Sequence, residues 1–182
     1  MEKKEEKQRK EILLIGYNLT SSNSDDQDID YPIRDAALNN KHVSITALYA
    51  DTSVDGTLTT IIKGTEGTHI TNIAAGGTEE KSSELVGIEH IESTKKKFDV
   101  IQLPLFGLKQ LKGTISRIFN LLKDNGKLIT FEDAHKNFVD EELGIGEPVK
   151  EFYCVEDELG IDKPQAKRPR LVYTKLPSLR FR

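Results

Sequence analysis

FDVIQL (98–103) and LLKDNGKLITF (121–131) are the two stretches of sequence that decide the fold. Each contains a short apolar run, typical of a strand that is buried on both faces of a parallel sheet. Between them, apolar residues recur at helical spacing over 108–123, which predicts a helix with one buried face. Asn125-Gly126 is expected to cap that helix, because glycine tolerates the left-handed conformation found at helix ends. A strand, a helix and a further strand in this order indicate an α/β fold.

The rest of the chain continues the alternation of strands and helices. Strands are predicted at 11–16, 42–51, 57–62, 68–73, 149–155 and 170–176, and helices at 33–38 and 133–143. The strands 57–62 and 68–73 are expected to form a hairpin. Whether that hairpin belongs to the main sheet is open at this point, and 82–92 fits a short helix or a brief strand.

Length and composition fit a single domain. The chain has 182 residues, with 36% hydrophobic and 31% charged residues, and its apolar residues are clustered enough to form a core. We expect a charged N-terminal tail at 1–10, one domain at 11–176 and a short basic tail at 177–182.

Charge and residue usage exclude several classes of function. A net charge of −4 gives no global basic field for nucleic acid. The only cysteine, Cys154, cannot form an intramolecular disulfide, and the 4 histidines lack the spacing of metal ligands, so no metal site is expected. The sequence contains no apolar run of membrane-spanning length and begins with a polar stretch. These features predict an intracellular protein, cytoplasmic or nuclear, without a membrane partner.

The strand 98–101 and the segment 118–129 resemble the fourth and fifth strands of class I S-adenosylmethionine-dependent methyltransferases. In that family an FDvI strand is followed by a helix that runs into LLkpgGkLi. The two last predicted strands resemble the antiparallel pair at the edge of the family's sheet. The resemblance covers about 97–176. It implies a methyltransferase-like Rossmann fold with a mostly parallel central sheet and a C-terminal antiparallel strand pair.

The first half of the chain departs from the family's pattern. The family's first strand ends in a glycine-rich turn that lets the backbone approach the cofactor, but IGYNLT (15–20) retains only Gly16. Leu19 and Thr20 would crowd an adenosyl group. Asp51 matches the acidic residue that binds the ribose hydroxyls in the family, although it also fits a solvated turn after a strand. If the chain binds the cofactor, the resemblance therefore assigns Gly16 and Asp51 to it.

Three hypotheses of function follow. The first is a degenerate, non-catalytic methyltransferase-like domain, without catalytic residues or cofactor, that acts as a protein-interaction scaffold or accessory subunit of a larger complex. The second is an active methyltransferase that uses S-adenosylmethionine with an atypical cofactor loop. The third is an RNA-binding accessory subunit, since basic residues gather towards the C-terminus. These residues are Lys167, Arg168, Arg170, Arg180 and Arg182. A further basic stretch, 95–97, fits phosphate contact or a solvated loop end.

Overall fold

The computed structural model describes residues 10–15, 43–50, 58–63, 69–103, 111, 113–131, 136–145, 148–151 and 170–177. Strands and helices alternate along the described chain. In order they are β1 (Lys10–Ile15), β2 (Val43–Ala50), β3 (Leu58–Lys63), β4 (His69–Ala75), α2 (Ser83–Ser93), β5 (Phe98–Gln102), α3 (Ile115–Phe119), β6 (Leu122–Phe131), α4 (Lys136–Leu143), β7 (Val149–Glu151) and β8 (Arg170–Thr174). The helix predicted at 33–38 and most of the strand predicted at 149–155 lie outside the described residues.

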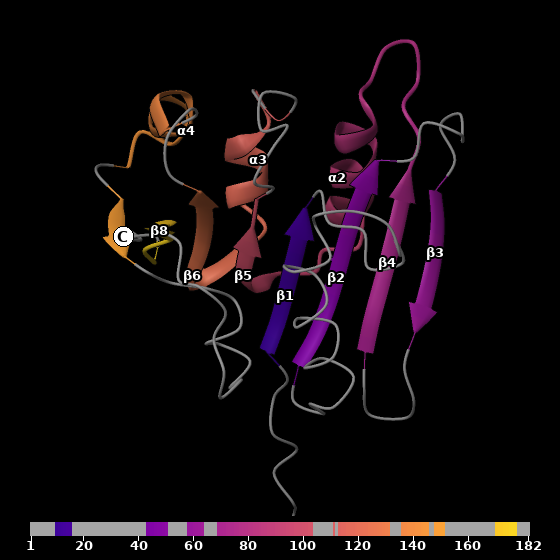
Figure 1. Ribbon diagram of the computed structural model, residues 1–182, viewed down its shortest axis with the longest axis horizontal. Coiled ribbons are helices and arrows are strands. Elements are labelled where there is room, and N and C mark those ends of the chain that lie inside the picture. The colour runs from indigo at the N-terminus through magenta and orange to yellow at the C-terminus, as the bar shows by residue number, and fades with distance from the viewer. Residues whose placement is uncertain are drawn as a thin grey trace, which may run out of the picture.

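The strands form one 8-stranded sheet in the order β3-β4-β2-β1-β5-β6-β8-β7 (Figure 1). Strands β4, β2, β1, β5 and β6 run parallel, in the 3-2-1-4-5 order of a doubly wound α/β sheet. At the other end, β8 pairs antiparallel with β6 and with β7. The structure thus confirms a mixed α/β sheet with a C-terminal antiparallel pair, consistent with a methyltransferase-like fold. The predicted hairpin is part of the main sheet, because β4 pairs with both β3 and β2.

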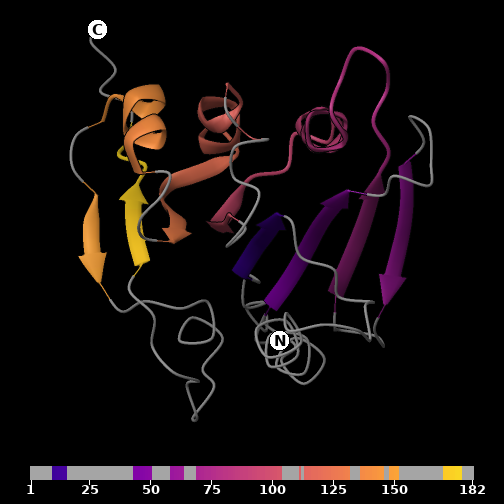
Figure 2. The same ribbon diagram turned by 45° about the horizontal axis from the view of Figure 1, so that its top comes forward.

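The core is centred on β1 and β5, which have neighbours on both sides. The side chains of Ile12, Leu13, Leu14 and Ile15 are all buried, as expected for a strand covered on both faces. The described helices α2, α3 and α4 lie along the same face of the sheet (Figure 2). The burial of four successive residues in β1, rather than the placement of these helices, accounts for its continuous apolar run.

The ambiguous segment 82–92 is helical, as α2. Ser82 caps it, because its side-chain oxygen accepts a hydrogen bond from the backbone N–H of Leu85 at 3.2 Å. The helix packs closely on β2 through Gly87. A β-carbon at Gly87 would lie only 2.3 Å from Cδ1 of Leu48. The absence of a side chain at this position therefore allows α2 to approach the sheet.

The prediction for 108–123 was wrong in its extent. In the described part of that segment, the α-helix covers only Ile115–Phe119, and the chain enters β6 at Leu122. Asn125-Gly126 therefore lies within β6, where the pairing with β5 shifts register. Asn125 has the positive φ of 64°. At Gly126, a β-carbon would lie 2.8 Å from the carbonyl oxygen of Lys123. Glycine is needed here for close approach within the strand, not as a helix cap.

The predicted helix at 133–143 is confirmed over its described part, α4. Gly144 ends it with a φ of +59°, and its N–H donates to the carbonyl of Asp140 at 2.9 Å. The hydroxyl of Tyr173 in β8 donates to Oδ1 of Asp140 at 2.5 Å. This contact holds α4 against the C-terminal antiparallel pair.

Candidate functional site

The strand order changes direction between β1 and β5. From β1 the parallel strands continue through β2 to β4 on one side, and from β5 to β6 on the other. In open α/β sheets, ligands bind beyond the carboxyl ends of the strands at such a switch point. Leu14 pairs with Gln102 across the switch, and Ile15 pairs with Leu48 of β2. The carboxyl ends of β1, β2 and β5 thus lie together at one edge of the sheet.

The described side chains at this edge are closely packed. Ile15 and Leu103 are fully buried, and Gln102 is only 2% exposed. The backbone N–H of Leu103 donates to the carbonyl of Ile129 at 3.0 Å, which continues the pairing with β6 beyond Gln102. A glutamine at the end of β5 fits either a polar role towards a ligand or a role in packing. Its burial agrees with packing.

Both predicted cofactor residues adjoin this edge in the sequence. Gly16 directly follows β1 and Asp51 directly follows β2. Both residues lie outside the described part of the chain. Because Ile15 pairs with Leu48, the carboxyl ends of β1 and β2 lie next to each other at this edge of the sheet. The assignment of Gly16 and Asp51 to a cofactor stays a prediction.

Of the predicted C-terminal basic residues, the structure describes Arg170. Arg170 begins β8, where its backbone pairs with Phe131 and Glu151. The other predicted nucleic-acid contacts lie outside the described residues; they are Lys167, Arg168, Arg180 and Arg182. Because β8 lies inside the sheet between β6 and β7, deleting 167–182 would damage the fold. The RNA hypothesis therefore needs single substitutions rather than truncation.

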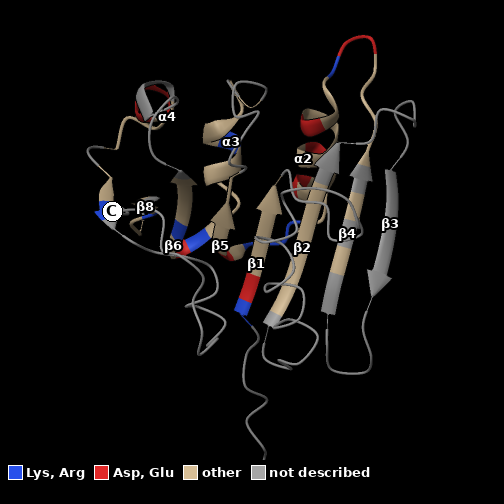
Figure 3. Cartoon of the chain, viewed as in Figure 1, with Lys and Arg blue, Asp and Glu red and all other residues tan. Residues whose placement is uncertain are grey.

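A charged cluster that sequence reasoning missed lies at the opposite, amino end of the sheet (Figure 3). Oδ2 of Asp99 accepts hydrogen bonds from the backbone N–H of Glu11 at 2.9 Å and from Nζ of Lys123 at 3.3 Å. Nζ of Lys96 lies 3.0 Å from Oε2 of Glu11 and 5.7 Å from the ring centre of Phe98. Lys96 thus forms an ion pair with Glu11 and lies over the ring of Phe98. The sequence signal for this cluster was Asp99, the second residue of β5, which follows the lysine run 95–97.

Positive charge is crowded in this cluster. Partial burial lowers the pKa of Lys10, Asp99 opposes that shift, and the neighbouring charge of Lys127 lowers the pKa further. Lys96 and Lys97 of the basic stretch 95–97 have defined partners in the fold, Glu11 and the carbonyl of Asn120 respectively. A freely solvated loop end does not describe these two residues.

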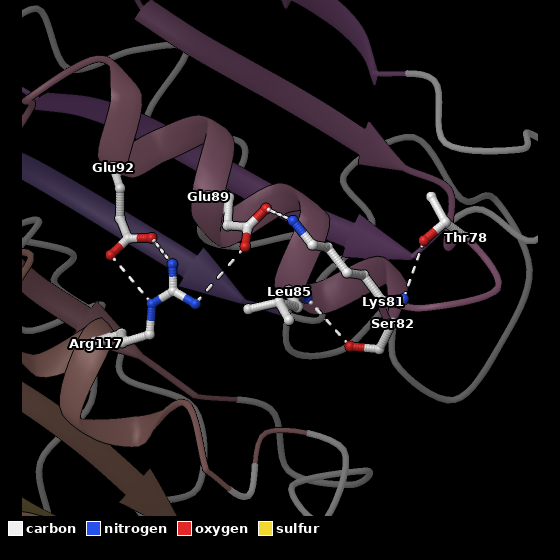
Figure 4. A network of polar contacts seen from close by, with 7 residues as sticks. All are labelled: Thr78, Lys81, Ser82, Leu85, Glu89, Glu92 and Arg117. Atoms are coloured by element: carbon white, nitrogen blue, oxygen red, sulfur yellow. Dashed lines mark hydrogen bonds and ion pairs between the residues drawn. The ribbon is translucent and has the colours of Figure 1, made fainter.

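A second polar network joins the helices α2 and α3 (Figure 4). Arg117 of α3 forms hydrogen-bonded ion pairs with Glu92, and its Nη1 lies 3.8 Å from Oε1 of Glu89. Nζ of Lys81 donates to Oε2 of Glu89 at 2.8 Å. The hydrogen bond from Lys81 lowers the pKa of Glu89, and the hydrogen bond to Glu92 raises the pKa of Arg117. These contacts connect two helices on the surface and contain no arrangement for catalysis.

Comparison with known proteins gives likeness to solved structures. The chain matches no family model and no curated protein. Among solved structures, it is similar to phosphoethanolamine N-methyltransferase 1 of Haemonchus contortus, solved with phosphoethanolamine and S-adenosylhomocysteine. The TM-score is 0.43 at 8% identity, over 94% of this chain and 37% of the other. The chain thus spans well under half of that protein. The strand order, rather than this likeness, relates the chain to the fold.

Metal-binding clusters and membrane-spanning helices are both absent from the described residues. These residues contain no group of three or more histidine, cysteine, aspartate or glutamate side chains that could hold a metal ion. Within the same residues, every helix is too short or too polar to cross a lipid bilayer.

Proposed function

We propose that this chain is a degenerate methyltransferase-like domain of Rossmann type that works without catalysis, as a scaffold or accessory subunit bound to a protein partner. The supporting observation is that the sheet has a ligand-binding switch point, while the sequence at that point lacks the glycines of a cofactor turn. The sheet has the switch point between β1 and β5 at which doubly wound proteins bind their ligands. The sequence that leaves β1 there, GYNLT (16–20), has one glycine where a cofactor turn needs several.

Exposed apolar side chains support a partner rather than a small ligand. Within the described residues, the exposed large hydrophobic side chains are Ile145, Val149 and Leu176. All three adjoin the C-terminal antiparallel pair: Val149 begins the edge strand β7, Ile145 precedes it, and Leu176 follows β8. Val149 is 61% exposed and Leu176 74% exposed, although aliphatic side chains favour burial. A partner that covers this edge would remove them from water.

Isothermal titration calorimetry of the full chain with S-adenosylmethionine tests the proposal. We expect no heat of binding, because Leu19 and Thr20 would crowd an adenosyl group in the turn after β1. Removing both side chains (Leu19→Gly with Thr20→Gly) gives the matched variant. Binding by that variant alone would attribute the loss of affinity to the loop. Micromolar binding by the natural chain would overturn the non-catalytic proposal.

An active methyltransferase is the second candidate, and the end of β2 favours it. Asp51 follows that strand at the place where the family has its ribose-binding carboxylate, and β2 is the parallel neighbour of β1. If the natural chain binds the cofactor, Asp51→Asn should weaken binding by about tenfold or more, because a carboxylate accepts charge-assisted hydrogen bonds from hydroxyls. Unchanged affinity would remove Asp51 from the cofactor site.

A further inference from the structure

Among the described residues, a set of segments at the amino end of the sheet carries more lysines than carboxylates. We define the amino-end lysine cluster by the described lysines at or just before the starts of β1 and β5, in the first six residues of β6 and directly after β8. They are Lys10, Lys95, Lys96, Lys97, Lys123, Lys127 and Lys175. The acidic residues in these same segments are Glu11, Asp99 and Asp124. The chain as a whole has a net charge of −4, so this excess of positive charge is local.

Two of these lysines are held in place by neutral partners. Nζ of Lys97 donates to the carbonyl oxygen of Asn120 at 2.6 Å, and Nζ of Lys175 donates to the carbonyl oxygen of Leu122 at 3.0 Å. A carbonyl carries no net charge, so neither contact is an ion pair, and each leaves two of the three ammonium donors for other partners. The accepting residues are two apart in the chain. The two ammonium groups therefore lie within roughly 13 Å of each other.

One carboxylate of this end, Asp99, serves several groups at once. Its Oδ2 accepts hydrogen bonds from both the backbone N–H of Glu11 and Nζ of Lys123. Burial contributes most to the lowered pKa of Lys10, Asp99 opposes that shift, and the like charge of Lys127 adds to it. An anion bound at this end would oppose the shift as Asp99 does.

We propose that the amino-end lysine cluster is a docking surface for the phosphate backbone of a nucleic acid, bound without reading the base sequence. Lysine binds phosphate as a point charge, and nucleic acids present closely spaced negative charges. The cluster has no arginine, and its described aromatic ring, Phe98, is buried beneath Lys96. Planar recognition and stacking of bases are therefore not provided by these residues.

An acidic protein fits this surface less well. Protein interfaces usually have an apolar core inside a polar rim. Of the large exposed hydrophobic side chains in the described chain, Leu176 alone adjoins the cluster. One leucine is too little for such a core. The cluster shares no residue with the predicted C-terminal contacts, so it can be tested without altering them.

Fluorescence anisotropy of the full chain with a labelled single-stranded RNA of about 20 nucleotides tests the proposal. We expect binding at about 50 mM salt that weakens steeply towards 200 mM, as counterion release requires. Lys97→Gln with Lys175→Gln should lower the affinity about tenfold or more and reduce the slope of log K against log salt by about 1.4. Replacing the same two residues by arginine should retain binding, because the positive charges remain.

Lys81→Gln with Lys150→Gln is the matched control, since it removes the same charge outside the cluster. We expect its affinity to stay near that of the natural chain. Circular dichroism and thermal unfolding check that each variant is folded. Absence of RNA binding at about 50 mM salt, or equal losses in both glutamine pairs, would overturn the proposal. Equally tight binding of poly-glutamate or of anionic lipid vesicles would overturn the choice of nucleic acid.

Discussion

The helices α2 and α3 lie on the same face of the sheet, yet their amino ends are stabilised in different ways. α2 has a local cap, since Ser82 accepts a hydrogen bond from Leu85 three residues later. The N-cap position of α3, Thr114, makes no side-chain capping bond. Instead Glu142 of α4 accepts from the backbone N–H groups of Gly113 and Ile115, at 2.5 and 3.1 Å. One helix carries its own start signal, and the other depends on a residue distant in sequence.

The close approach of α2 to the sheet gives the first prediction. Gly87→Ala should destabilise the protein by about 1–3 kcal/mol, because the new methyl group overlaps the buried side chain of Leu48. At an ordinary helix site the same change would stabilise by roughly 0.5–1 kcal/mol. Urea unfolding measures the sign.

Leu48→Ala supplies the control for that prediction. Alone it should cost about 2–5 kcal/mol through the lost burial and the cavity. Combined with Gly87→Ala, the methyl group gains room, so the second change should add little or even stabilise. Strict additivity of the two substitutions would show that α2 does not pack against Leu48 in this way.

The dependence of α3 on α4 gives the second effect. Glu142→Ala leaves two backbone donors of the α3 amino end without their charged acceptor, at a cost of about 1.5–3 kcal/mol. Ser82→Ala removes one neutral cap from α2 and should cost about 1 kcal/mol. Glu141→Ala, at an exposed neighbouring position, is the control and should change stability little. A larger loss from Ser82→Ala than from Glu142→Ala would reverse the comparison.

These two caps also explain what the sequence could predict. The pattern of 82–92 fitted a short helix or a brief strand, and the cap by Ser82 became evident only from the structure. The periodic apolar residues of 108–123 indicated a long helix, whereas Leu121 and Leu122 already belong to the turn and to β6. Apolar residues that face one core keep a helical spacing by chance across a helix, a turn and a strand. Local pattern alone did not separate these three elements.

Strands were easier to predict than sites. Central strands such as β1 and β5 contain continuous apolar runs, so their burial on both faces can be predicted from the sequence. The charged contacts are not, since Glu11 and Asp99 meet only because their strands are neighbours in space. The resemblance predicted the antiparallel pair, β7 with β8, from the order of elements. It could not predict that Glu142 would stabilise α3.

The smallest predicted effect concerns the ionic contacts of α2. The hydrogen bond from Lys81 lowers the pKa of Glu89 from its ordinary value of 4.5, so Lys81→Gln should raise it, as measured by NMR titration of the side-chain carboxyl. Arg117→Gln should raise it less, because Arg117 acts on Glu89 only through the weaker charge interaction. A lowered folded-state pKa favours the ionised carboxylate, so its contribution to stability is present above the unfolded-state pKa and is lost as the pH falls through the folded-state value. The Glu89 carboxyl is exposed, so high salt should weaken the shift. An unchanged titration midpoint of Glu89 in Lys81→Gln would mean that this ion pair is not formed in solution. The surface contacts of α2 would then contribute less to holding the helix than the cap by Ser82 and the close approach to β2.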